Sequence, residues 1–229
     1  GTNTDPYQPI ERDLEVTRGI LEVLLETRHP LTIVTKSALI LRDIELLAEL
    51  AKRKLVAVMV SLTTLDPDLK RRLEPRTAGP SRRLHVMAEL AARGVPVGTM
   101  LAPIIPGLND YELERMAEAA AAHGARTAGY VLLRLPYEVK DLFVEWLGEH
   151  YPERAEHVLS LLRQMRGGQL NDPRFHERQR GAGPFAALLH ARFENARRKH
   201  GLDGDSAFNL DTESFRPPKD PDSAQLDLL

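Results

Sequence analysis

The sequence has 229 residues, of which 42% are hydrophobic and 28% charged, with a formal net charge of −2. This composition is typical of a folded chain with a sizeable core, and the charge favours no class of partner. No run of about 18 apolar residues occurs, so we expect no membrane segment and, by default, a cytoplasmic location. The absence of cysteine excludes disulfides, zinc–thiolate sites and thiol nucleophiles from these residues.

The first two thirds of the chain alternate between helical and extended patterns. Leucine and isoleucine at helical spacing predict helices, and short runs of β-branched or apolar residues predict strands. Asn109 and Glu112 form the pattern of a capping box at the start of one of these helices. The predicted elements are helix 12–28, strand 31–37, helix 43–53, strand 56–64, helix 81–93, strand 95–103, helix 110–123 and strand 127–136.

These strands are apolar almost throughout, which indicates burial on both faces and hence a parallel sheet covered by helices. Periodicity leaves two architectures open, a doubly wound sheet and a (β/α) barrel. In both, ligands bind at the carboxyl ends of the strands. Polar residues follow the strands at these ends, and the opening stretch "GTNTDPYQPIE" has the same character. We therefore expect it to be a loop after a strand that lies upstream of this sequence.

The composition changes beyond residue 150. Helix 152–165, a loop rich in Gly and Arg, and helix 185–200 form a basic region, with nine Lys/Arg against three Asp/Glu between 163 and 199. The last part has a negative net charge instead, with seven acidic and two basic residues from 203 onward. Few large apolar residues occur there, which predicts disorder. The predicted organisation is 1–150 as an α/β domain, 151–202 as a helical basic extension and 203–229 as a disordered acidic tail.

Several polar residues at the strand ends are candidates for ligand binding. Lys36 could neutralise a carboxylate or phosphate beside Ser37, although a surface lysine at a loop start fits equally well. The hydroxyl of Ser61 either points into the mouth of the sheet or bonds its own backbone. The loop "PIIPGLND" is mainly a structural turn, on which a ligand could still pack at Ile104 and the backbone of Pro103. The eight histidines show no metal-ligand spacing, so no metal site is assigned.

Taken together, "GTNTDPYQPIE", "VTKSALILRD", "VSLTTLD…LEPRTAGPSRRL", "APIIPGLND" and "GYVLLRLP" resemble radical SAM proteins related to spore photoproduct lyase, often labelled DNA repair photolyase-like. The resemblance covers residues 1 to about 200. It implies a partial parallel (β/α) barrel with a C-terminal helical extension. It also implies a [4Fe–4S] cluster on a CxxxCxxC loop and S-adenosylmethionine (SAM), which is cleaved reductively to a radical that abstracts hydrogen from a substrate. Because this sequence lacks cysteine, it resembles the C-terminal two thirds of such an enzyme, without the first strand, the first helix and the cluster loop.

The resemblance also implies roles for individual residues. Asp5 and its neighbour meet the methionyl amino group, Lys36 the carboxylate, and Ser61 the carboxylate or ribose. The loop at Pro103 lies beside the adenine, and Tyr130 and Arg134 face the substrate. The implied SAM-binding residues are Thr4, Asp5, Lys36, Ser37, Ser61, Thr63, Pro103 and Ile104.

The leading hypothesis is therefore the SAM-binding part of a radical SAM enzyme, acting in DNA repair, that is inactive without its cluster. One alternative is an enzyme that binds a phosphorylated metabolite at the same edge, and a second is a non-catalytic nucleic-acid-binding module built on 163–199. The last five residues, "QLDLL", resemble the short motif that docks bacterial DNA proteins on the sliding clamp. That resemblance implies that Gln225 anchors by hydrogen bonds while Leu226, Leu228 and Leu229 fill an apolar groove.

Overall fold

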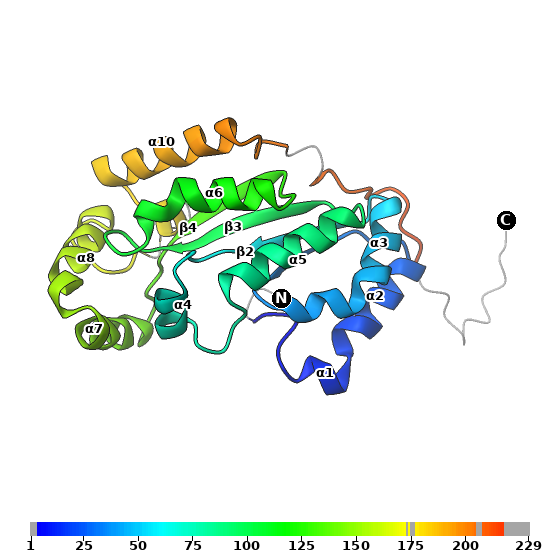
Figure 1. Ribbon diagram of the computed structural model, residues 1–229, viewed down its shortest axis with the longest axis horizontal. Helices are drawn as coiled ribbons and strands as arrows, with labels where there is room; N and C mark the ends of the chain where they lie inside the picture. The colour runs from blue at the N-terminus through cyan, green and yellow to red at the C-terminus, as the bar shows by residue number, and fades with distance from the viewer. Residues whose placement is uncertain (1–3, 173, 175–176, 205–207, 218–229) are drawn as a thin grey trace.

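Four strands form one parallel sheet in the order in which they occur along the chain. A computed structural model describes residues 4–172, 174, 177–204 and 208–217. The strands are β1 (Leu31–Thr35), β2 (Val56–Ser61), β3 (Val97–Ile104) and β4 (Thr127–Leu132) (Figure 1). Each predicted strand is thus present, and most of the polar residues at its end follow the last paired residue.

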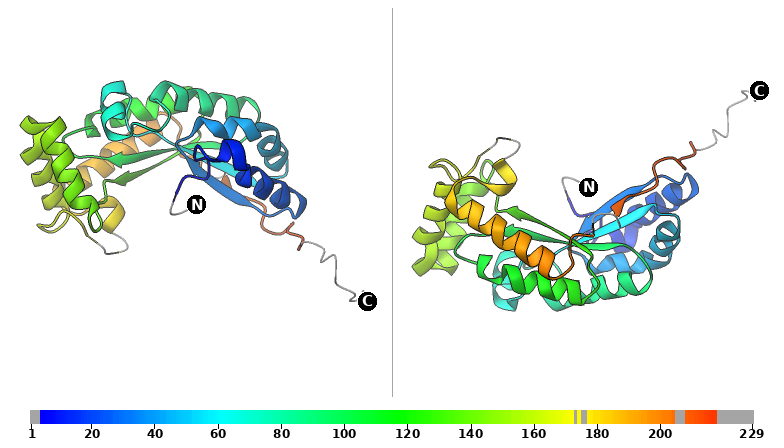
Figure 2. Two further views of the ribbon diagram at one scale, coloured as in Figure 1. Left: turned by 90° about the horizontal axis from the view of Figure 1, so that it is seen from below. Right: turned by 90° about the horizontal axis from the view of Figure 1, so that it is seen from above.

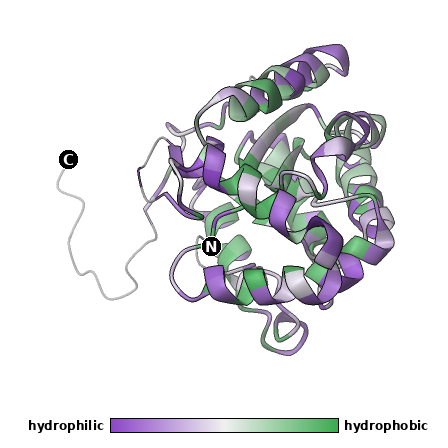
Figure 3. Cartoon of the chain, turned by 90° about the vertical axis from the view of Figure 1, so that its left-hand side faces the viewer, coloured by the Kyte–Doolittle hydropathy of each residue, from purple (hydrophilic) through white to green (hydrophobic). Residues whose placement is uncertain are grey.

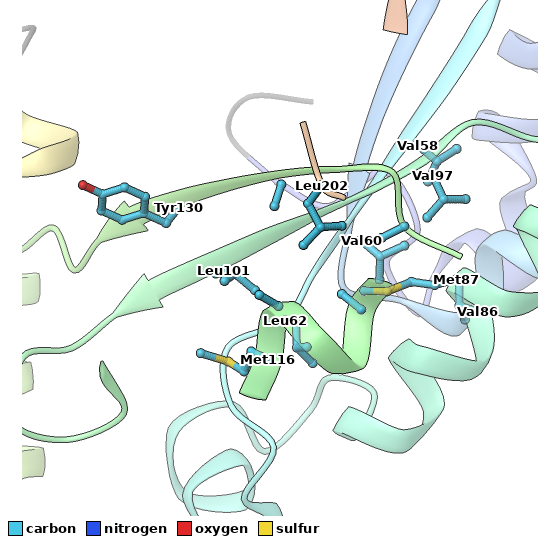
Figure 4. Close-up of a cluster of buried hydrophobic side chains, with 14 of the residues drawn as sticks. Val58, Val60, Leu62, Val86, Met87, Val97, Leu101, Met116, Tyr130 and Leu202 are labelled. Carbon is cyan, nitrogen blue, oxygen red and sulfur yellow. The ribbon is translucent and has the colours of Figure 1, made fainter. Parts of the chain in front are cut away.

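Three helices cover one face of the sheet, namely α3 (Ile44–Lys52), α5 (Pro80–Ala92) and α6 (Leu113–Ala122). Each parallel connection moves one strand further in the same direction, and right-handed crossovers then place every helix on the same side. Alternate strand residues, such as Val58, Val60 and Leu101, pack against these helices (Figure 4). The order contains no reversal of the kind that defines a doubly wound sheet. The described residues therefore form an open α/β sheet consistent with a partial (β/α) fold.

The remaining helices lie around this core (Figure 2). Helices α7 and α8 build a second apolar cluster with Leu69 of α4, at the opposite end of the molecule from α1 and α2. Helix α10 packs on α6 and α8. The bounds are α1 (Glu11–Leu14), α2 (Val16–Glu26), the 3-10 helix η1 (Ala38–Asp43), α4 (Pro67–Leu73), η2 (Asp110–Glu112), α7 (Val139–His150), α8 (Pro152–Met165), α9 (Glu177–Arg180) and α10 (Pro184–Lys199). Apolar residues gather toward the middle of the molecule (Figure 3). No helix in the described residues is long and apolar enough to cross a membrane.

The predicted helix 12–28 is in fact two helices. Glu15 between them has a φ of 50°, in the left-handed region, which interrupts the helical path. The Glu11 carboxylate then accepts a hydrogen bond from the backbone N–H of Thr17 (2.9 Å), in the first turn of α2. The prediction missed this break because apolar spacing continues across it.

The structure contradicts the predicted disorder for the part of the tail that it describes, residues 203–204 and 208–217. These residues lie along the amino ends of the four strands, at the edge of the sheet opposite the polar strand ends. Asp203 bridges to Thr127 of β4, and Phe208 packs beside Gly98 of β3. Further contacts are Asp211 N–H to the Lys54 carbonyl (2.9 Å), Arg216 N–H to the Thr27 carbonyl (2.7 Å), and the ring of Phe215 on His29. Gln225, Leu226, Leu228 and Leu229, the proposed clamp-binding residues, lie outside the described residues.

We expect Gly98→Ala to destabilise the protein, because Gly98 sits where Phe208 meets the sheet. A Cβ atom at position 98 would lie 2.5 Å from the Met59 sulfur and 2.6 Å from the Thr127 methyl group. Overpacking of this kind costs about 1–3 kcal/mol of unfolding free energy, measurable by urea denaturation.

The matched control is Gly148→Ala on the exposed side of α7, where a Cβ atom meets nothing within 4 Å. Alanine is the better helix former, so this change should stabilise by about 0.5–1 kcal/mol. An unfolding free energy that rises in Gly98→Ala as it does in Gly148→Ala would contradict the packing described at Gly98.

Candidate functional site

A cavity of about 700 Å³ opens at the carboxyl end of β1. Its wall combines the N-terminal loop, the residues that follow β1, and the loop that leads into α5. These segments are far apart in sequence and meet because parallel strands present their carboxyl ends at one edge. The lining residues are Asp5, Tyr7, Gln8, Pro9, Arg12, Lys36, Ser37, Ala38, Leu39, Arg76, Thr77, Ala78 and Arg82.

Asp5 joins the N-terminal loop to the end of β1. Its Oδ1 accepts hydrogen bonds from the Tyr7 N–H (2.9 Å) and the Thr35 hydroxyl (2.7 Å), and its Oδ2 accepts one from the Lys36 N–H (2.8 Å). The carboxylate therefore fixes the backbone that carries Lys36 and still borders the cavity. Ser37 beside it caps η1, because its hydroxyl accepts the Leu39 N–H (3.2 Å).

The ammonium group of Lys36 is held by Glu74, with which it forms an ion pair. Glu74 is in turn paired with Arg83 (2.6 Å), whose side chain is 2% exposed. Arg83 also donates to the Thr77 hydroxyl (2.6 Å), the Ala78 carbonyl (2.8 Å) and the Ser61 carbonyl (3.1 Å). One buried guanidinium thus connects the end of β2 with the loop before α5, and through Glu74 it sets the position of Lys36.

The charges of this network determine the ionisation of Glu74. Burial raises the pKa of its carboxyl, but the Arg83 guanidinium and the Lys36 ammonium together lower it by more, so the pKa lies below the ordinary value of 4.5. Glu74 is therefore a carboxylate at neutral pH, and it balances Arg83 inside the protein.

Five of the predicted SAM-binding residues do not line the cavity. The Thr63 hydroxyl is buried and bonds the Ala102 carbonyl (2.9 Å) and Glu74 (3.1 Å). The Ser61 side chain is buried on the sheet face opposite the helices. The other three are Thr4, Pro103 and Ile104, of which Ile104 belongs to the hydrophobic core. The cavity brings together the remaining three, Asp5, Lys36 and Ser37.

The predicted substrate-facing pair, Tyr130 and Arg134, lies outside this cavity. Tyr130 shares its strand face with Ala128 and Leu132, and its ring packs under α10, with 4.7 Å between the centroids of the Tyr130 and Phe193 rings. Its hydroxyl is buried without a hydrogen-bond partner among the described residues. Arg134 follows β4 and is exposed, and neither residue lines the cavity.

Sequence reasoning missed Arg83, although a signal for it exists. Arg83 lies at positions i, i+3, i+4 and i+7 with Val86, Met87 and Leu90, the buried face of α5. A charged residue within such a stripe is buried, and buried charges are paired. The same reasoning does not apply to the three arginines that line the cavity, Arg12, Arg76 and Arg82.

The predicted capping box at Asn109 is wrong. Asn109 is fully buried and makes no side-chain cap for η2. Instead its Oδ1 accepts the Ile105 N–H (2.6 Å), and its Nδ2 donates to the carbonyls of Thr63 (2.7 Å) and Pro103 (3.0 Å). It therefore ties the loop after β2 to the loop after β3, next to the Arg83 network.

Comparisons with known proteins give one family and several relatives. The family model described as "Radical SAM superfamily" matches residues 1–120. The uncharacterized protein Rv2578c of Mycobacterium tuberculosis is 36% identical over 165 residues, which are 71% of this chain and 48% of that protein. The uncharacterized protein MJ0683 of Methanocaldococcus jannaschii is 29% identical over 153 residues, 67% of this chain and 56% of that protein. The chain thus spans about half the length of these curated relatives.

We expect Arg83→Met to destabilise the protein by about 3–5 kcal/mol at pH 7, because it leaves the Glu74 carboxylate buried with one partner fewer. The pKa of Glu74 is lowered in the folded state, so its contribution is present above pH 4.5 and is lost as the pH falls through the folded-state value. The stability difference between wild type and variant, measured by urea denaturation, should therefore narrow below pH 4.5.

Arg71→Met is the control, since Arg71 and its partner Asp68 are 71% and 65% exposed. Exposed pairs contribute at most about 1 kcal/mol, so this variant should stay near wild type at every pH. Equal losses of unfolding free energy in the two variants would contradict the role of Arg83 in the buried network.

Proposed function

The chain belongs to the radical SAM superfamily, and on that premise we propose that the cavity beside β1 receives the amino-acid end of SAM. The observation that carries the proposal is the presence of Asp5 and Lys36, of opposite charge, on one cavity wall. A zwitterionic amino acid requires an anion for its ammonium group and a cation for its carboxylate. Ser37 lines the same cavity.

The residues present fit SAM in size as well as in charge. The cavity volume of about 700 Å³ lies within the range of small-molecule sites. Lys36 is held by Glu74 and Asp5 by three hydrogen bonds, so neither side chain needs to be reordered when a ligand binds. Such preorganisation lowers the entropic cost of binding.

The residues of this chain do not fit the cluster in the same way. Clusters of this class are held by thiolates, and the sequence contains no cysteine. No group of three or more His, Asp or Glu residues that could hold a metal ion occurs in the part of the chain that the structure describes. We therefore assign this chain no cluster ligand and limit its role to holding SAM and substrate.

In this superfamily, SAM bound at a reduced cluster supplies hydrogen-abstraction chemistry. The residues of this chain contribute position and electrostatics to it. Lys36 neutralises the methionyl carboxylate, Asp5 accepts from the ammonium group, and the buried Arg83–Glu74 pair keeps Lys36 in place. The partial sheet would form part of the (β/α) barrel that encloses the reaction in this superfamily.

We also propose membership of the group related to spore photoproduct lyase, and a role in DNA repair. These finer proposals are supported by the order of the loops "GTNTDPYQPIE", "VTKSALILRD" and "APIIPGLND" in the sequence. The competing hypothesis is an enzyme that binds a phosphorylated metabolite and does not use SAM. It predicts that the chain does not bind SAM.

Lys36→Ala should weaken SAM binding at least about tenfold, because a charge-assisted hydrogen bond to a carboxylate contributes about 1.5–3 kcal/mol. Equilibrium dialysis with radiolabelled SAM measures the affinity. The control is Lys52→Ala, since Lys52 also pairs with a glutamate, Glu49, but on the exposed side of α3. An unchanged affinity in Lys36→Ala would remove Lys36 from the site.

A peptide of residues 218–229 should bind a bacterial sliding clamp with roughly micromolar affinity, the scale expected for a short peptide that becomes ordered on binding. Fluorescence anisotropy with a labelled peptide measures it. A peptide carrying Gln225→Ala and Leu228→Ala should not bind, and equal binding of the two peptides would end the proposal.

A further inference from the structure

Three arginines line the cavity in addition to Lys36. Arg12 belongs to α1, Arg76 to the loop before α5, and Arg82 to the first turn of α5. All three side chains are exposed, and none forms an ion pair or side-chain hydrogen bond among the described residues. Asp5 is the one anionic side chain in the lining. The cavity wall therefore carries a surplus of positive charge that the protein itself leaves uncompensated.

SAM does not account for these arginines. Its amino-acid end carries one carboxylate, which Lys36 matches, and its sulfonium group is a cation that guanidinium groups repel. A second ligand with several negative charges is needed to balance Arg12, Arg76 and Arg82. Guanidinium groups bind phosphate through paired, charge-assisted hydrogen bonds, and they are the side chains that suit this task best.

The segments that carry the arginines are fixed by buried contacts. Arg83 holds both sides of the loop around Arg76, through the Glu74 carboxylate before it and the Thr77 hydroxyl and Ala78 carbonyl after it. Arg42 donates to the Glu11 carbonyl, next to Arg12, and the Glu11 carboxylate accepts the Thr17 N–H. Because neighbouring residues are anchored, the three guanidinium groups lose only side-chain freedom when they bind.

We propose that the substrate of this site carries phosphate or phosphodiester groups, and that Arg12, Arg76 and Arg82 bind them. The proposal rests on the proposed function, in which SAM occupies the Asp5–Lys36 side of the same cavity. Two sources supply this chemistry, a phosphorylated small molecule and the backbone of a nucleic acid. They differ in the salt dependence of binding, which is steep for a nucleic acid because counterions are released.

The test compares the 229-residue wild type with the triple variant Arg12→Gln, Arg76→Gln, Arg82→Gln. The probes are pyrophosphate, titrated by calorimetry, and a fluorescein-labelled 12-nucleotide single-stranded DNA, titrated by anisotropy between 50 and 200 mM salt. We expect the triple variant to bind the preferred probe at least tenfold more weakly. The control is Arg93→Gln, at the opposite end of α5 from Arg82, which should stay within twofold of wild type.

Each outcome has a defined reading. Preference for the oligonucleotide with a steep salt dependence identifies a nucleic-acid backbone, and preference for pyrophosphate identifies a small phosphorylated substrate. An unchanged affinity in the triple variant, an equal loss in Arg93→Gln, or no binding of either probe to wild type overturns the proposal. SAM binding, measured by dialysis, should persist in the triple variant and fall in Lys36→Ala. Phosphate binding without any SAM binding would refute the proposed function and leave the arginine site standing.

Discussion

The buried ion pair between Arg83 and Glu74 is the interaction on which the cavity depends. Arg83 reaches the end of β2 through the Ser61 carbonyl and the loop before α5 through Thr77 and Ala78. Glu74 carries the same network outward to Lys36. A buried charge without its partner is costly, whereas a fully bonded one fixes a single arrangement of its neighbours. The positions of Lys36 and Arg76 in the wall therefore follow from one side chain inside it.

A second buried polar contact lies beside the first. Asn109 bonds the carbonyls of Thr63 and Pro103, and Thr63 also meets Glu74 through its hydroxyl. Two adjacent strand ends are thus linked by side-chain hydrogen bonds where the ladder of the sheet has ended. This cross-linking keeps the carboxyl edge rigid although it consists of loops. Rigid loops on a parallel sheet are a common basis for ligand sites, because binding then costs little ordering entropy.

The charges of the cavity divide into two sets. Asp5 and Lys36 are bonded within the protein and present opposite charges, as an amino-acid ligand requires. Arg12, Arg76 and Arg82 have no such partners and present positive charge alone. We propose that the first set receives SAM, as superfamily membership suggests, and that the second set binds the substrate. Enzymes with the same fold and cofactor differ in the residues around the reacting molecule.

The sequence by itself determined the elements of the sheet and the edge at which the site lies. Apolar runs and helical spacing are local properties, so β1 to β4 and the helices between them could be predicted, and polar strand ends marked Lys36 and Asp5.

What the tertiary structure decided was which side chains face the cavity. In strands that are apolar on both faces, the sequence does not show which alternate residues meet the helices, so Tyr130 was expected at the site but lies under α10. Arg76 and Arg82 reach the cavity because the connection after β2 returns over the edge beside β1, a long-range juxtaposition that no local pattern encodes. The segment from 208 to 217 was likewise expected to be disordered from its composition, and it is held by backbone hydrogen bonds and aromatic contacts to residues more than a hundred positions earlier.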